Sequence, residues 1–192
     1  MKVTMSDVAK AAGVDKATVS RALKGDPRIS EKTRALVMDS VRTLGYRPDL
    51  NARHLSTNRS GFIGLLLREL NAPGSIEFIS GLDRAISNSE YDLLIKCTDG
   101  DPRRAARELA KLSDRDIEGL IWEDSENLPK DISVPLLTIG FKHSGSISLL
   151  SEDGGRLLTF ETGALAGRLL LTAIMGRPVP THEVIIRNSK GE

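Results

Sequence analysis

Residues 5–24 read MSDVAKAAGVDKATVSRALK, which is the pattern of two short helices joined by a tight turn. Gly13 occupies the turn, where a positive φ angle costs glycine least. Asp15 is placed to cap the second helix, because its side-chain oxygens can accept from free backbone N–H groups. The stretch therefore predicts helices over about 6–12 and 16–23 in a helix-turn-helix arrangement.

The second helix offers small and polar side chains from its first turn, namely Lys16, Ala17, Thr18, Ser20 and Arg21. Recognition helices place their N-terminal residues against base edges in the major groove of DNA, so this helix suits that role. From these residues alone, an ordinary helical hairpin with a solvated face is the alternative.

A third helix follows a loop at Gly25-Asp26-Pro27, since glycine and proline both interrupt helices. Ser30 is placed as its N-cap and Gly45 as its end. Its apolar residues fall at helical spacing, at Leu36, Val37, Val41 and Leu44. Residues 1–46 thus predict a small three-helix domain.

Residues 47–60 predict a hinge and linker. Residues 49–56 can form a short helix, and residues 57–61 are polar. A helix of this length is marginal alone in water. We therefore expect it to become ordered only with a partner or on DNA.

The charge of the chain is unevenly distributed. Residues 1–60 hold 12 basic and 6 acidic residues, a net charge of +6, whereas residues 61–192 hold 15 and 20, a net charge of −5. A basic head on an acidic body is typical of a nucleic-acid binder whose second domain stays away from the phosphates.

From Phe62 the pattern changes to strands that alternate with helices. FIGLLL, residues 62–67, is apolar on both faces, as in a strand of a covered parallel sheet. Further strands are predicted over 91–98, 119–123, 135–141, 146–151 and 184–187, and helices over 76–89, 102–112 and 163–175. Residues 61–192 therefore predict a single α/β domain with a doubly wound parallel sheet.

The sequence lacks the motifs that are typical of several other classes of function. Cys97 is the one cysteine and the three histidines are scattered, so no metal-ligand spacing or disulfide framework is expected. No phosphate-binding glycine loop or nucleophile elbow occurs, and we expect no cofactor and no catalytic residue. The apolar runs are too short to span a bilayer and the N-terminus has no secretory apolar region, so we expect a cytoplasmic protein.

The first sixty residues resemble the DNA-binding region of the LacI/GalR family of bacterial transcription regulators. The resemblance rests on five blocks and their spacing: SDVAKAAGV, ATVSRAL, ISEKTRALV, LGYRP and NARHL. Later blocks, GFIGLLL, DIEGLIW and ALAGRLLLTAIMGRPVP, resemble one lobe of the family's effector-binding core, which is similar to half of a periplasmic sugar-binding protein. Family members usually carry two such lobes, and this chain has room for one.

The resemblance implies which residues contact DNA. It places Lys16, Ala17 and Arg21 at base edges, where Lys or Arg can donate to guanine and Ala can contact a thymine methyl group. It also implies that Leu55 wedges between base steps in the minor groove, and that Ala52, Arg53 and His54 line this groove. Hydroxyl and basic side chains that fit phosphate anchoring are Thr4, Thr18, Ser20, Lys24, Arg28, Ser30 and Thr33.

An effector site is doubtful on this sequence. Arg68, Glu69 and Asn71 follow the first strand, where the family's first lobe touches its effector, and Asp99 and Glu123 lie near strand ends. A good site buries most of a small ligand, and one lobe supplies one wall of the cleft.

The sequence therefore predicts a sequence-specific transcriptional regulator, a repressor that binds a near-palindromic operator as a homodimer at the nucleoid. The alternatives are a sugar or nucleoside sensor whose DNA binding depends on its effector, a truncated remnant without a stable core, and an α/β enzyme with a DNA-targeting head. The missing catalytic motifs argue against the last.

Overall fold

The computed structural model describes residues 3–46, 59–123, 128–129, 132–152 and 157–187. The chain divides into two compact units, Met1–Thr57 and Asn58–Glu192. Residues 47–58 of the predicted hinge and linker, which spans 47–60, lie outside the described residues, and Ala52, Arg53, His54 and Leu55 are among them.

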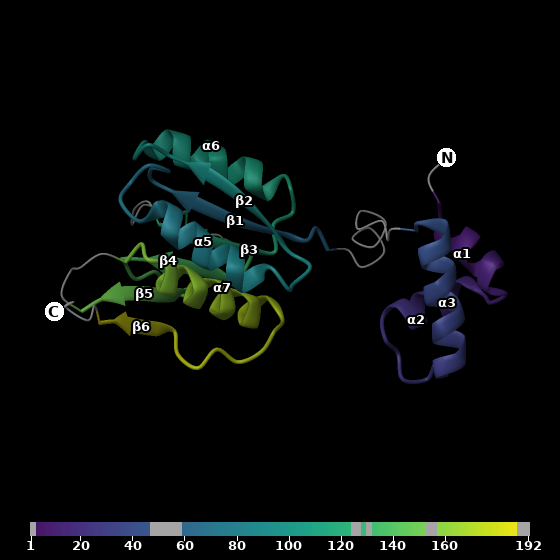
Figure 1. Cartoon of the computed structure of the whole chain (residues 1–192). Helices are drawn as coiled ribbons and strands as arrows, with labels where there is room; N and C mark the ends of the chain where they lie inside the picture. The colour runs from purple at the N-terminus through teal and green to yellow at the C-terminus, as the bar shows by residue number, and fades with distance from the viewer. Residues whose placement is uncertain (1–2, 47–58, 124–127, 130–131, 153–156, 188–192) are drawn as a thin grey trace. The chain divides into compact units, whose positions relative to one another are not determined.

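The N-terminal unit contains three helices in its described part, α1 (Met5–Ala12), α2 (Lys16–Leu23) and α3 (Glu31–Leu44) (Figure 1). One side chain from each helix is completely buried where the three meet: Val8, Val19 and Val37. The predicted helix-turn-helix and the third helix are confirmed.

One prediction for α3 is wrong. Leu36 was expected in its apolar stripe, but this side chain is 50% exposed. The buried stripe follows Val37, with Val41 and Leu44 half-buried beside it. Leu36 precedes Val37 by one residue, and successive residues of a helix point about 100° apart, so it faces away from the core.

Each helix of the head begins at a side-chain cap. Asp15 accepts from the Thr18 backbone N–H at 2.8 Å, and Ser30 accepts from the Thr33 N–H at 3.2 Å, as the sequence predicts. At α1, the Asp7 carboxylate accepts from the Thr4 backbone N–H at 2.9 Å. These bonds satisfy donors that a helix leaves unpaired at its start.

The C-terminal unit is a six-stranded parallel sheet in the order β2-β1-β3-β4-β5-β6. Its strands are β1 (Phe62–Leu67), β2 (Asp92–Cys97), β3 (Gly119–Trp122), β4 (Leu136–Ile139), β5 (Ile147–Ser151) and β6 (Glu183–Ile186). The predicted strands and the doubly wound parallel sheet are confirmed.

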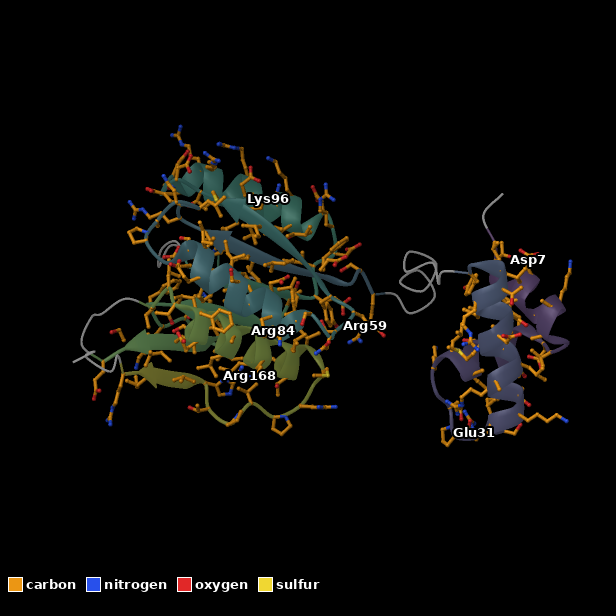
Figure 2. The ribbon with its side chains drawn as sticks, in the orientation of Figure 1. Asp7, Glu31, Arg59, Arg84, Lys96 and Arg168 are labelled. Atoms are coloured by element: carbon orange, nitrogen blue, oxygen red, sulfur yellow. The ribbon has the colours of Figure 1, made fainter. Side chains whose placement is uncertain are left out.

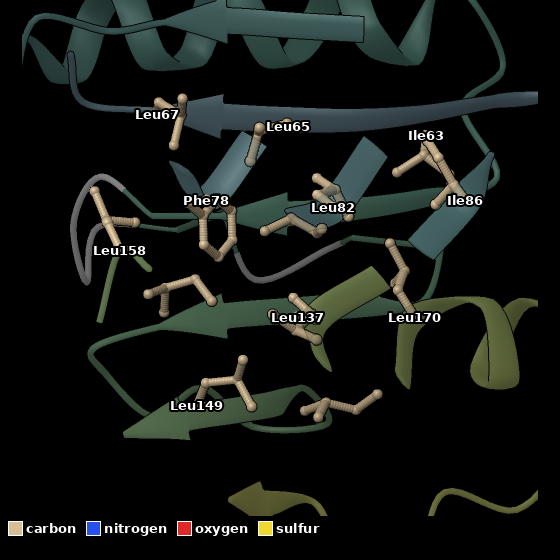
Figure 3. Close-up of a cluster of buried hydrophobic side chains, with 14 residues drawn as sticks. Ile63, Leu65, Leu67, Phe78, Leu82, Ile86, Leu137, Leu149, Leu158 and Leu170 are labelled. Atoms are coloured by element: carbon tan, nitrogen blue, oxygen red, sulfur yellow. The ribbon is translucent and has the colours of Figure 1, made fainter. Parts of the chain in front are cut away.

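Helices cover both faces of this sheet (Figure 1). On one face, α5 (Ser75–Ile86) and α7 (Phe160–Ile174) cover Ile63, Leu65 and Leu67 (Figure 3). On the other face, α6 (Pro102–Ser113) packs on Leu66. Strand β1 is thus buried on both sides, which explains its continuous apolar sequence.

Helices α5 and α7 cross in very close contact at two glycines. A Cβ atom on Gly81 would lie 1.9 Å from the Phe160 carbonyl oxygen, and one on Gly163 would lie 2.0 Å from the Phe78 carbonyl oxygen. Each glycine therefore receives the backbone of the other helix, and any side chain there would push the helices apart.

We expect Gly163→Ala to destabilise the C-terminal unit. Alanine favours a helix over glycine by up to about 1 kcal/mol, but overpacking a rigid contact costs about 3 kcal/mol, so the clash decides the sign. The fluorescence of Trp122, the one tryptophan, reports unfolding of this unit alone. Arg168→Ala, an exposed change on the same helix, is the control, and an unchanged midpoint for Gly163→Ala would refute the close contact.

We also expect the head to lose stability in acid. Hydrogen bonds lower the pKa of Asp7, through the Thr4 side chain first, and of Asp15, through the Thr18 backbone first. A carboxylate with a lowered folded pKa stabilises the fold above its unfolded pKa, near pH 4, and loses this contribution as the pH falls through the folded value.

Thermal unfolding followed by far-ultraviolet circular dichroism between about pH 6 and pH 2 measures this loss. Asparagine at position 15 would still cap the helix but would not titrate, so Asp15→Asn should show a shallower acid dependence than the unmodified chain. Equal acid dependence of the two proteins would contradict the expected role of the Asp15 carboxylate.

Candidate nucleic-acid interface

Helix α2 presents its predicted base-reading residues outward. Lys16, Ala17 and Arg21 are exposed, whereas Val19 and Ala22 on the opposite side are buried against α1 and α3. The cap at Asp15 fixes where the helix begins, and the buried pair fixes its rotation. The first turn of α2 is therefore free to approach another molecule.

Hydroxyl groups at the helix starts are engaged within the head. The Thr18 hydroxyl donates to Asp15 Oδ2 at 2.8 Å, and the Thr4 hydroxyl donates to Asp7 Oδ2 at 2.7 Å. The Ser30 and Thr33 hydroxyls lie 2.9 Å apart, and either of them can donate to the other. A hydroxyl has a single proton, so Thr4 and Thr18 cannot donate to a phosphate while these bonds stand.

Of the other predicted phosphate anchors, Lys24 is exposed and Ser20 is half-buried. Arg28 is exposed on the loop between α2 and α3, and its guanidinium pairs with the Asp26 carboxylate at 2.7 Å. This bonding to Arg28 holds the pKa of Asp26 far below its usual range. The pairing of Asp26 with Arg28 was not predicted from the sequence.

A second unpredicted cluster lies where the chain enters the C-terminal unit (Figure 2). The Glu118 carboxylate accepts from the Gly61 backbone N–H at 2.9 Å and from the Tyr91 hydroxyl at 2.9 Å, and it forms an ion pair with Arg59 Nε at 3.1 Å. Burial, followed by the bond to Glu118, raises the pKa of Tyr91 to about 12. No local motif could reveal a contact between residues 57 positions apart.

Three of the five residues predicted as remnants of an effector site lie together at one edge of the sheet, the edge formed by the carboxyl ends of its strands. Arg68, Asp99 and Glu123 follow the neighbouring strands β1, β2 and β3, and the Arg68 backbone N–H donates to Glu123 Oε2 at 3.0 Å. The Asp99 carboxylate pairs with Arg104. Glu69 and Asn71 are exposed on the loop after β1.

Two hollows in the described part of the C-terminal unit lie away from this edge. One of about 250 Å³ is bordered by Leu109 and Ile117. The other, of about 340 Å³, is bordered by His143 and His182. Neither is lined by any of the five effector candidates.

The described residues hold neither a candidate metal site nor a helix that could span a membrane. They contain no group of three or more His, Cys, Asp or Glu side chains that could hold a metal ion. None of their helices combines the length and apolar character needed to cross a membrane.

Comparison with known proteins gives consistent results. The family described as bacterial regulatory proteins, lacI family, matches residues 4–49. The HTH-type transcriptional regulator DegA of Bacillus subtilis (strain 168) is 34% identical over 122 residues, which cover 64% of this chain and 36% of DegA. The sucrose operon repressor of Klebsiella pneumoniae is 36% identical over 155 residues, covering 78% of this chain and 46% of the repressor.

A solved structure has the same fold. The crystal structure of the lac repressor dimer bound to operator and the anti-inducer ONPF aligns with a TM-score of 0.66 and 19% identity, over 97% of this chain and 65% of that one. The chain spans between about a third and about half of the length of the curated relatives it matches. Residues 4–49 therefore match the lacI family of bacterial regulatory proteins, and the chain is similar to part of a transcriptional regulator and of an operon repressor.

Proposed function

We propose that this chain is a sequence-specific DNA-binding transcriptional regulator, and that it represses by occupying an operator. The observation that carries the proposal is the outward face of α2, on which Lys16, Ala17 and Arg21 are exposed within a domain of net positive charge. Base reading by these residues follows from the chemistry of the major groove, where Arg and Lys donate to guanine O6 and N7.

The remaining DNA contacts belong to the same proposal. Phosphates are held by Ser20, Lys24 and Arg28, and by the hydroxyls of Thr4, Thr18, Ser30 and Thr33 after their internal bonds open. Residues 47–60 act as a hinge, in which Leu55 enters a minor-groove base step with Ala52, Arg53 and His54 beside it. Residues 1–46 then form the head and residues 61–192 the core.

The active species is a homodimer on a near-palindromic operator. Two-fold symmetry in a protein requires two half-sites in its DNA, and a hinge too short to be stable alone gains order by pairing with a second copy. The lac repressor, which shares the fold, was crystallised as a dimer on its operator. A regulator of this kind works in the cytoplasm, at the nucleoid.

An effector-responsive sensor is the second candidate function. It is favoured by the convergence of Arg68, Asp99 and Glu123 at one edge of the sheet. We expect no thermal shift with a panel of sugars and nucleosides, because Asp99 is already paired with Arg104 and one lobe forms one wall of a cleft. A saturable shift that also changes operator affinity would favour the sensor.

Selection from random duplex DNA, with the purified full chain and with or without the small-molecule panel, tests the main proposal. We expect one near-palindromic sequence to be enriched, and the same sequence under both conditions. Failure to enrich any sequence at low salt would overturn the proposal.

Arg21→Ala should weaken binding to the enriched site by about tenfold to a hundredfold, because one bidentate base contact discriminates by roughly 1–3 kcal/mol. Binding to random duplex should weaken far less. Arg42→Ala removes the same charge from the exposed side of α3 and serves as the control in mobility-shift titrations. Equal losses for the two variants on both DNAs would show that Arg21 contributes charge alone.

Leu55→Ala should weaken operator binding and reduce the bend of the bound DNA, because a smaller side chain cannot hold a base step open. The bend is measured by energy transfer between dyes at the two ends of the operator duplex. Leu50→Ala, the same truncation five residues earlier, is the control and should leave the bend unchanged. A full bend with Leu55→Ala would rule out the wedge.

A further inference from the structure

The loop between α2 and α3 holds an ion pair of defined geometry. Arg28 Nε lies 3.0 Å from Asp26 Oδ1, and Arg28 Nη2 lies 2.7 Å from Asp26 Oδ2. The two side chains differ sharply in exposure, with 14% for Asp26 and 78% for Arg28. The Asp26 carboxylate is thus largely covered by the loop, while the Arg28 guanidinium extends into the solvent.

Asp26 is itself held in place by both neighbouring helices. Its backbone N–H donates to the Arg21 carbonyl at 3.0 Å, near the end of α2. Its carbonyl accepts from Arg34 Nη2 on α3 at 3.0 Å and from the Ile29 N–H at 3.1 Å. Asp26 Oδ1 also accepts from the Arg28 backbone N–H at 2.9 Å. The anchor of the ion pair is therefore rigid relative to the recognition helix.

The pair leaves one edge of the guanidinium available. A guanidinium carries five N–H donors in a planar fork, and the side-on pair with Asp26 uses the Nε–H and one Nη2–H. Three donors remain, and two of them, one on Nη1 and one on Nη2, form the second fork of the group. This fork has the geometry that receives a phosphate or a base edge in two parallel hydrogen bonds.

We propose that Asp26 is a positioning residue for DNA recognition, which fixes Arg28 as an oriented fork beside the recognition helix. This inference rests on the proposed function and adds to it a determinant of specificity. A free arginine attracts any phosphate and releases counterions wherever it binds. An arginine neutralised by Asp26 gains little binding affinity from its charge alone. It binds well only where two acceptor atoms of the partner are aligned with the two N–H groups of the fork.

The charge of Asp26 also reaches the base-reading residue. Its pKa is lowered by Arg28 first and, more weakly, by the charge of Arg21. Asp26 therefore pairs with Arg28 and exerts only a weaker electrostatic attraction on Arg21, at the position where α2 passes into the loop. Random DNA gains less from the paired Arg28 than it would from a free arginine.

Two conservative variants isolate this role. Asp26→Asn retains an oxygen that accepts from the Arg28 N–H, so the loop can keep its shape while the guanidinium is released. Arg28→Lys retains the positive charge but cannot form the fork. Asp39→Asn removes the same negative charge from a loose surface pair on α3, 3.7 Å from Arg42, and is the matched control.

The experiment compares the full-length variants on the enriched site and on random duplex of equal length, from about 50 to 200 mM salt. We expect Asp26→Asn to bind random duplex more tightly and to lower the ratio of specific to random affinity about fivefold to tenfold. Its plot of log affinity against log salt for random duplex should steepen by about 0.9, the value for one added phosphate contact. Arg28→Lys should lower the ratio similarly, and the double variant no further.

Three results would overturn the inference. Asp26→Asn and Asp39→Asn could change both affinities by the same factor, which would mean that only net charge matters. Asp26→Asn could lower both affinities together with the melting temperature of the head, which would make the pair a structural brace. The double variant could lower the ratio by the product of the single effects, which would show that the two residues act independently. If the unmodified chain enriches no DNA site at all, the proposed function fails first, and this inference falls with it.

Discussion

The Asp15 carboxylate sets the start of α2, and the orientation of every other residue in this helix depends on that start. The first N–H groups of a helix have no partner within it, and here one is satisfied by Asp15. Once residue 16 is the first helical position, Val19 and Ala22 fall on the buried side and Lys16 and Arg21 on the open side. A shift of one residue would rotate each side chain by about 100° and would bury charges.

The bonding of the acidic residues in the head explains how the surface proposed to bind DNA can contain them. Asp7 and Asp15 cap helices and Asp26 binds Arg28, so these carboxylates are directed into hydrogen bonds with their own domain. The positive charge is carried by exposed side chains such as Lys16 and Lys24. A net charge of +6 over residues 1–60 therefore understates how basic the outer face of α2 is.

Local sequence signals predicted the elements well, because helices and buried strands are specified by residues close in the chain. Caps such as Ser30 and the six strands were predicted for this reason. Helix α7 begins at Phe160, before the predicted Gly163, because Thr159 caps it by accepting from the Thr162 N–H. Two of the contacts that were missed join distant residues, Glu118 with Gly61 and Gly81 with the backbone of α7, whereas the missed pair of Asp26 and Arg28 lies within one loop. Periodicity reports which face is apolar, but it does not report what that face meets.

The C-terminal unit has its own apolar core and a fixed attachment point for the linker. Strand β6 forms one edge of its sheet, and α7 packs closely against α5 at two glycines. The unit therefore has an apolar core of its own. At the linker, Gly61 is bonded by its N–H to Glu118 and by its carbonyl to the Asp92 N–H, at 2.8 Å. Gly61 is therefore held at a fixed point on this sheet. An apolar core within the unit and a fixed Gly61 are consistent with the proposed homodimer, in which this unit would join two copies of the head.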